Sequence, residues 1–337
     1  MATRADVAKL AKVSPSTVSY VLSGTRSISE ETRKKVLSAI KELDYRPNHA
    51  AGSLAGGRSK IIAFIVPSGK SGMSPSFVEY ISGVSNAVRE RGYHLTIYNN
   101  NEITPKEIYH FYQSGVLDGV VLMEIEYNDK RVEFLTSRHV PLVLIGRTGK
   151  DVKLSFVDRD FETDGEAAVN YLSKLGHTSI ALIRVRRSEK DTGISADIRF
   201  FESIKKACKQ LGVTLWDRYS ENSAAAGRET FIKLRNEHPE ISAAITLGDY
   251  LTFAFVNAAN EFGIKVPKDY SILALAIPDI SIELTWPALT TLTVKDEELG
   301  YNAGKILLDR LENESEESVH QLWRGELVER GTTAKKI

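Results

Sequence analysis

The first sixty residues carry three short segments in which apolar residues recur at helical spacing. In the first segment, Thr3 and Asp6 stand at the spacing of a capping box, which marks the start of a helix. The apolar positions that follow are Val7, Leu10 and Ala11. This pattern predicts a first helix that has one buried face and ends near Lys12.

Two further helices are predicted after short connections. Ser14 offers an N-cap hydroxyl and Pro15 a preset first helical position, so the second helix begins there and ends at Gly24. Its inward positions are Val18, Val21 and Leu22. A third helix begins at Ser29. Its buried stripe consists of Val36, Leu37, Ile40 and Leu43.

After Ser59 the pattern changes to continuous apolar runs that are separated by segments of helix length. The runs are IIAFIV, HLTIY, GVVLM, PLVLI, IALI, AAITL and SILAL. Continuous apolar strands belong to parallel sheets that are covered on both faces. Because about 280 residues are too many for one such sheet, we expect two doubly wound α/β subdomains with a ligand cleft between the carboxyl ends of their strands.

Charge separates these two regions. The whole chain is neutral, with 44 basic and 44 acidic residues, but residues 1–60 contain 11 Lys or Arg and only 5 Asp or Glu. A positive end on a mildly negative body predicts phosphate binding that weakens as the salt concentration rises. A solvated basic helix face would give the same charge without any nucleic acid, and both interpretations are open at this point.

Several other classes of protein are disfavoured. The single cysteine, Cys208, excludes an intrachain disulfide, and the amino terminus lacks an apolar signal segment, so we expect a cytoplasmic protein. No apolar run has the length of a membrane span, so no membrane partner is expected. The segment PSGKSG at 67–72 lacks the second glycine of a phosphate-binding loop, because Phe64 stands at that position.

Nothing in the sequence predicts an enzyme. The seven histidines show no metal-ligand spacing, and no serine lies in a GxSxG turn. We therefore expect no catalytic residue, no cofactor and no metal.

Two stretches of the first region, ADVAKLAKVSPSTVSYVLSG and ISEETRKKVLSAIKELDYRPN, resemble the headpiece of the LacI/GalR transcription regulators. The resemblance continues through LGHTSIALI, VPKDYSIL, PALTTL and ELVERGTT, so it covers essentially the whole chain. It implies a helix-turn-helix headpiece at 1–46, a hinge helix or linker at 47–59, and an effector-binding and dimerisation core of the periplasmic-binding-protein type at 60–337. Lobe one is expected at about 60–160 plus 291–321, and lobe two at about 161–290 plus 322–337.

The resemblance also implies a homodimer on double-stranded DNA. Its two headpieces read the half-sites of a near-palindromic operator, and Leu54 of each linker enters the minor groove as an apolar wedge. A buried leucine at the domain junction is the alternative for Leu54. The DNA-binding positions that the resemblance implies are Thr3, Pro15, Ser16, Thr17, Ser19, Tyr20, Asn48 and Leu54. Among these, Ser16 and Tyr20 are the polar base readers, whereas Pro15 offers only an apolar contact.

The effector positions of the family are partly altered in this chain. Phe77 keeps one of two aromatic residues, and it either stacks on a sugar or fills the lobe core. Arg147 follows the PLVLI run, where open α/β sheets bind ligands. Ala196 and Ile277 replace the arginine and the aspartate of the family. The expected effector-binding residues are Phe77, Arg147, Lys190, Thr192, Arg199, Asn222, Asp249 and Asp279.

These observations predict a sequence-specific transcriptional regulator that represses a carbohydrate-utilisation operon under the control of a small sugar or glycoside. The altered cleft leaves an alternative, a regulator of the same type whose cleft is vestigial and whose activity is set by a protein partner or by concentration. A free solute-binding protein is a remote alternative, because such a protein needs no headpiece.

Overall fold

A computed structural model describes residues 2–23, 26–45, 58–66, 75–99, 103–149, 153–186, 193–313 and 317–336. The chain divides into two compact units, Met1–Ser59 and Lys60–Ile337. Gly24, Asn48, Leu54, Lys190 and Thr192 lie outside the described residues. None of the described helices is both long enough and apolar enough to cross a membrane.

The smaller unit contains the three predicted helices, α1 (Arg4–Ala11), α2 (Pro15–Ser23) and α3 (Glu30–Glu42). The capping box is confirmed, since the Asp6 N–H donates to the Thr3 hydroxyl oxygen and the Asp6 carboxylate accepts the Thr3 N–H. The core of the unit consists of Val7, Ala8, Ala11, Val18, Val36 and Ala39.

The prediction that three leucines are buried in this core is wrong. Leu10, Leu22 and Leu37 are 42%, 39% and 47% exposed. Ala8 and Ala39 are buried in their place, because closely packed helices accept small side chains at the contact and leave the larger ones at its margin.

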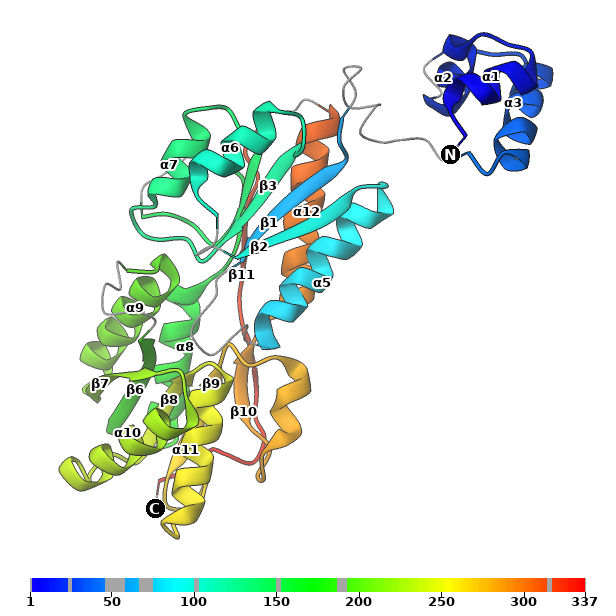
Figure 1. The fold of residues 1–337 in the computed structure, drawn as a ribbon. Coiled ribbons are helices and arrows are strands. Elements are labelled where there is room, and N and C mark those ends of the chain that lie inside the picture. Colours follow the sequence, from blue (N-terminus) through cyan, green and yellow to red (C-terminus); the bar gives the residue numbers. More distant parts are fainter. Residues whose placement is uncertain are drawn as a thin grey trace. The chain divides into compact units, whose positions relative to one another are not determined.

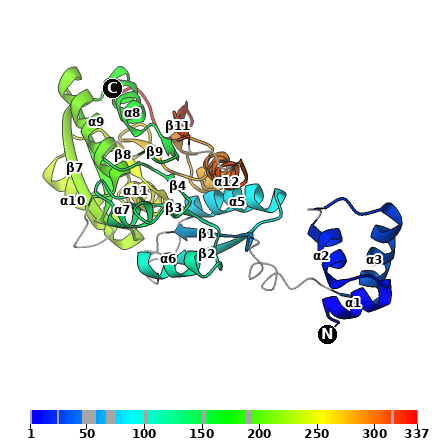
Figure 2. The same cartoon turned by 90° about the horizontal axis from the view of Figure 1, so that it is seen from above.

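The first sheet of the larger unit has the strand order β11-β5-β4-β3-β1-β2, and all its strands are parallel. Its strands are β1 (Ile61–Val66), β2 (His94–Asn99), β3 (Gly119–Met123), β4 (Leu142–Ile145), β5 (Phe156–Arg159) and β11 (His320–Trp323). Helices α5 (Pro75–Glu90) and α12 (Asp296–Asn313) lie side by side on one face (Figure 1 and Figure 2). Helices α6 (Pro105–Gln113) and α7 (Lys130–Thr136) cover the other face.

The second sheet has the order β12-β10-β9-β8-β6-β7. Its strands are β6 (Ser179–Arg186), β7 (Thr214–Glu221), β8 (Ala243–Leu247), β9 (Ser271–Leu275), β10 (Thr290–Thr293) and β12 (Glu326–Val328). Helices α8 (Phe161–Lys174) and α9 (Ser195–Leu211) cover one face, and α10 (Ala224–Glu237) and α11 (Asp249–Glu261) the other. The two doubly wound subdomains are thus confirmed, with β12 as an antiparallel edge strand that was not expected.

The chain passes between the two sheets three times. The first passage follows β5 and leads into α8 (Figure 1). The second follows β10 and the third follows β11, so they lie after Thr293 and Trp323, slightly later than the expected positions 291 and 322. Strand pairing explains the shift, because Leu292 still pairs with β9 of the second sheet and Leu322 with β5 of the first.

Candidate nucleic-acid interface and effector site

Helix α2 presents a polar outer face because Val18, which is completely buried, fixes its inner face against the other two helices. Pro15 and Ser16 are exposed on the first turn of the helix, and Tyr20 is half-buried one turn further on. The predicted base readers therefore lie on one side of a short, firmly packed helix, which is the arrangement that a major groove accepts.

Two neighbouring positions, Thr17 and Ser19, have structural roles within the headpiece. The Thr17 N–H donates to the Ser14 hydroxyl oxygen at 3.1 Å, which caps the helix. The Ser19 hydroxyl donates to the carbonyl oxygen of Pro15 and accepts a hydrogen bond from Arg4 at 2.9 Å. Thr17 and Ser19 thus help to hold the headpiece together, and DNA contact at these two residues stays a prediction.

Two arginines that the sequence did not single out lie beside this face. Arg4 contacts Ser19, and the Arg26 guanidinium lies 5.5 Å from the centre of the Tyr20 ring. They place positive charge next to the polar helix, where DNA phosphates flank a groove. Their signal in the sequence was only the overall basic charge of residues 1–60.

Thr3 has a structural role of its own. Its hydroxyl donates to the Asp6 carboxylate at 2.6 Å. Hydrogen bonds from the Thr3 side chain and backbone lower the pKa of Asp6, so this carboxylate stays ionised at the amino end of α1. Thr3 is exposed on the same unit as the helix α2 face, and DNA contact at this residue stays a prediction.

In the larger unit, Arg147 and Arg199 converge on one carboxylate. Arg147 follows β4, and its Nη2 lies 2.5 Å from Oε2 of Glu162. Arg199 lies on α9, and its Nη1 donates to Oε1 of the same glutamate at 2.9 Å. Glu162, in the first turn of α8, therefore receives one guanidinium on each oxygen.

A second carboxylate and a backbone carbonyl complete this cluster. Arg147 Nε donates to Asp158 Oδ2 at 3.0 Å, and Arg199 Nη2 donates to the Thr148 carbonyl oxygen at 2.8 Å. Burial raises the pKa of Asp158 to about 6, although Arg147 acts in the opposite direction. Glu162 differs from Asp158 in exposure, since its side chain is 42% exposed and that of Asp158 only 6%.

Backbone hydrogen bonds join the lobes close to Arg199. The Tyr127 N–H donates to the Gly193 carbonyl oxygen at 3.0 Å, and the Ser195 N–H donates to the Ile125 carbonyl oxygen at 2.9 Å. An antiparallel bridge lies between these two bonds. The start of α9, which carries Arg199, is thereby fixed to the lobe that carries Arg147.

The other described candidates have different surroundings. Phe77 is half-buried and packs against the core of the first lobe, which favours the core-filling interpretation. Asp249 is 2% exposed, begins α11 and accepts the Tyr250 N–H at 2.9 Å. Asn222 is half-buried after β7, and Asp279 begins a 3-10 helix whose range is Asp279–Leu284.

The residues that sequence reasoning missed here are Asp158 and Glu162. Both occur in the polar stretch FVDRDFET, in which no charged residue stands out from its neighbours. Only the folded chain shows which of these carboxylates meet the two arginines.

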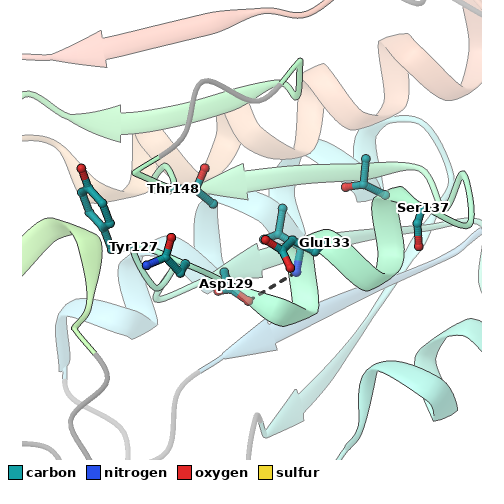
Figure 3. A pocket seen from close by; sticks show the side chains of 8 residues that line it. Tyr127, Asp129, Glu133, Ser137 and Thr148 are labelled. Carbon is teal, nitrogen blue, oxygen red and sulfur yellow. Dashed lines mark hydrogen bonds between the residues drawn. The ribbon is translucent and has the colours of Figure 1, made fainter.

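A cavity of about 340 Å³ lies beside α7 in the first lobe, and Thr148 of the arginine cluster is one of its lining residues (Figure 3). It is lined by Tyr127, Asn128, Asp129, Val132, Glu133, Thr136, Ser137 and Thr148. Asp129 is buried, accepts the Val132 N–H at 3.3 Å and forms an ion pair with Arg131, so its charge is satisfied by the first turn of α7. Among the described residues, no group of three or more His, Cys, Asp and Glu side chains is arranged to hold a metal ion.

Comparison with known proteins agrees with this arrangement. Residues 3–48 match the family described as bacterial regulatory proteins of the lacI family, and residues 169–333 match a periplasmic binding protein-like domain. The HTH-type transcriptional repressor PurR of Erwinia tasmaniensis is 33% identical over 326 residues, which cover 94% of this chain and 93% of that protein. The repressor of the same name from Proteus mirabilis is 32% identical and covers 99% of this chain and 97% of its own length.

Solved structures show the same fold over nearly the whole length. The Lac repressor dimer bound to operator and an anti-inducer has a TM-score of 0.85 at 23% identity and covers 99% of both chains. A complex of the transcriptional regulator CelR with cellobiose has a TM-score of 0.72 at 25% identity and covers 98% of this chain and 100% of its own. The chain therefore belongs to the LacI family of bacterial transcription regulators and is a sequence-specific DNA-binding repressor rather than an enzyme.

Proposed function

We propose that this repressor controls a carbohydrate-utilisation operon and is itself controlled by a small sugar-like effector that binds between the lobes of its core. It acts in the cytoplasm as a homodimer, in which each headpiece reads one half-site of a near-palindromic operator. The effector changes DNA affinity because it binds the DNA-competent and DNA-incompetent arrangements with different affinities.

The observation that carries the effector part of this proposal is the meeting of Arg147 and Arg199 on Glu162. The two arginines come from different lobes, so a molecule that binds both of them senses the relative position of the lobes. The carbohydrate part is supported by the CelR structure, whose description names cellobiose as the bound molecule.

The decisive experiment is fluorescence anisotropy on palindromic operator candidates from the upstream region of the gene. Binding is measured at fixed salt with and without monosaccharides, disaccharides, sugar phosphates and purine bases. Specific binding that one carbohydrate changes supports the proposal. Specific binding that only a purine base changes overturns the carbohydrate effector while retaining effector control.

A second candidate is a repressor of this family with a vestigial cleft, controlled by a protein partner or by concentration. It is favoured by the internal partners of both arginines and by the buried, apolar Ile277, which is 2% exposed at the position of the family aspartate. This candidate predicts specific operator binding that no small molecule in the panel alters.

The Leu54→Ala substitution tests the wedge in the minor groove. It should weaken specific operator binding by at least roughly tenfold and leave nonspecific binding nearly unchanged, because only the specific complex requires an unstacked base step. Leu10→Ala is the matched control, since it removes an exposed leucine from the same unit. Equal loss of specific and nonspecific affinity for Leu54→Ala would contradict the wedge.

The Arg147→Ala substitution tests the effector site. We expect it to abolish the effector response in the anisotropy experiment and to spare operator affinity, because Arg147 belongs to the core unit and not to the headpiece. Arg228→Ala is the control, because it removes an arginine from a surface ion pair with Glu261. An unchanged response would remove Arg147 from the site.

A further inference from the structure

The two arginines of the effector site offer donors only. Guanidinium groups carry N–H donors and no acceptor, whereas a neutral sugar hydroxyl both donates and accepts hydrogen bonds. The acceptor that the two arginines share is the Glu162 carboxylate, which receives Arg147 at 2.5 Å and Arg199 at 2.9 Å. The position between the two arginines is therefore occupied by an anionic group, and its chemistry is that of an anion site.

The exposed fraction of each side chain distinguishes the fixed members of the cluster from the one that can be exchanged. The Arg147 and Arg199 side chains are 18% and 19% exposed, and each has a further fixed partner in Asp158 and the Thr148 carbonyl. The Glu162 side chain is 42% exposed and extends from the first turn of a helix. Rotation of this one side chain into solvent leaves two oriented guanidiniums facing a common point.

Resting on the proposed function, we propose that this point binds an anionic group of the effector, and that the phosphate or carboxylate of a sugar derivative displaces Glu162 from Arg147 and Arg199. The exchange keeps the charge of the cluster balanced, because one anion replaces another. It also keeps both lobes tied to one group, since Arg147 and Arg199 belong to different lobes. Glu162 is thus an internal competitor that sets the affinity for the effector.

The test uses inorganic phosphate as the probe, in the full-length protein at constant ionic strength. Phosphate affinity is measured by thermal shift for the unsubstituted protein and for Glu162→Gln, which keeps the size of the side chain and removes its charge. Affinity should rise by roughly tenfold in Glu162→Gln, because the internal competitor loses its charge-assisted hydrogen bonds. Adding Arg199→Gln to this variant should remove the gain.

Glu261→Gln is the matched control, since it opens the exposed ion pair with Arg228 and leaves the cluster intact. Its phosphate affinity should equal that of the unsubstituted protein. Equal affinity in Glu162→Gln and the unsubstituted protein would overturn the inference, and so would a gain that survives the additional Arg199→Gln substitution.

Matched ligand pairs then decide which anion the site accepts. Calorimetric titration compares glucose with glucose 6-phosphate and with gluconate on the same two proteins. Binding of the charged sugars that strengthens in Glu162→Gln supports the inference and distinguishes phosphate from carboxylate. If neutral glucose binds more tightly than the charged sugars, the inference of an anion site is overturned, while effector control by a neutral sugar is retained. Failure of effector control as a whole is seen in a different experiment, as operator binding that no ligand changes.

Discussion

Two groups of ion-paired side chains near the junction of the lobes differ in their access to solvent. Arg159 and Asp164 form a hydrogen-bonded ion pair in which the two side chains are 5% and 1% exposed. Arg147 and Arg199 share Glu162, whose side chain is 42% exposed. The buried Arg159–Asp164 pair is thus suited to fixing the fold, whereas the exposed Glu162 is suited to exchange for another anion.

The buried pair joins segments that lie at or next to the three passages between the lobes. Arg159 ends β5, and its Nη2 donates to the Leu292 carbonyl oxygen at 2.7 Å. Asp164 lies in the first turns of α8, and its Oδ1 accepts the Gly325 N–H at 2.7 Å. The partners of the two groups therefore belong to different segments of the chain, so the pair holds these segments in one arrangement.

The largest expected effect comes from breaking the buried pair. Asp164→Asn should lower the free energy of unfolding by about 3–5 kcal/mol, because it leaves the Arg159 charge buried without a countercharge. Urea denaturation of the full chain measures the loss, with Glu261→Gln at an exposed pair as the control. A loss below about 1 kcal/mol would contradict the distinction between the two clusters.

An intermediate effect is expected at Asp158, the buried partner of Arg147. Burial raises its pKa in the folded protein from an ordinary 3.8 to about 6, so the folded state binds this proton more tightly than the unfolded state. The resulting stabilisation is present below about pH 4 and is lost as the pH rises through 6. Between these limits the unsubstituted protein should lose about 1–3 kcal/mol more than Asp158→Asn.

This pH dependence is measured by urea denaturation at a series of pH values for both proteins. The difference between their unfolding free energies should change across the interval and stay constant above it. Parallel curves for the two proteins would show that Asp158 titrates with an ordinary pKa and that the cluster is more open to solvent than its geometry indicates.

The smallest effect on stability is expected at Glu162. Glu162→Gln should change the free energy of unfolding by less than about 1 kcal/mol, because an exposed carboxylate loses little when its ion pair opens. Thermal or urea unfolding of this variant provides the measurement. A loss as large as that of Asp164→Asn would make Glu162 a fixed structural partner and would remove the contrast between the clusters.

Much of the fold was predictable because the chain repeats strong local signals. The seven continuous apolar runs identified β1, β2, β3, β4, β6, β8 and β9, and the Thr3 capping box identified the start of α1. Two of the strands that the apolar runs missed, β5 and β7, are polar for a physical reason. Strand β7 lies at a sheet edge with mixed burial, and β5 contains Asp158 and Arg159, whose charges are tolerated only because other segments pair with them.

The sequence by itself determined the family, the headpiece with its outward Ser16 and Tyr20, and the two doubly wound subdomains, because caps, periodicity and motifs are local properties of the chain. The tertiary structure alone decided which charges meet. Arg147 and Arg199 are 52 positions apart in the chain, and their convergence on Glu162 depends on how β4, α8 and α9 pack. Electrostatic partners are set by distance and burial in the folded protein, and neither quantity is written in the order of the residues.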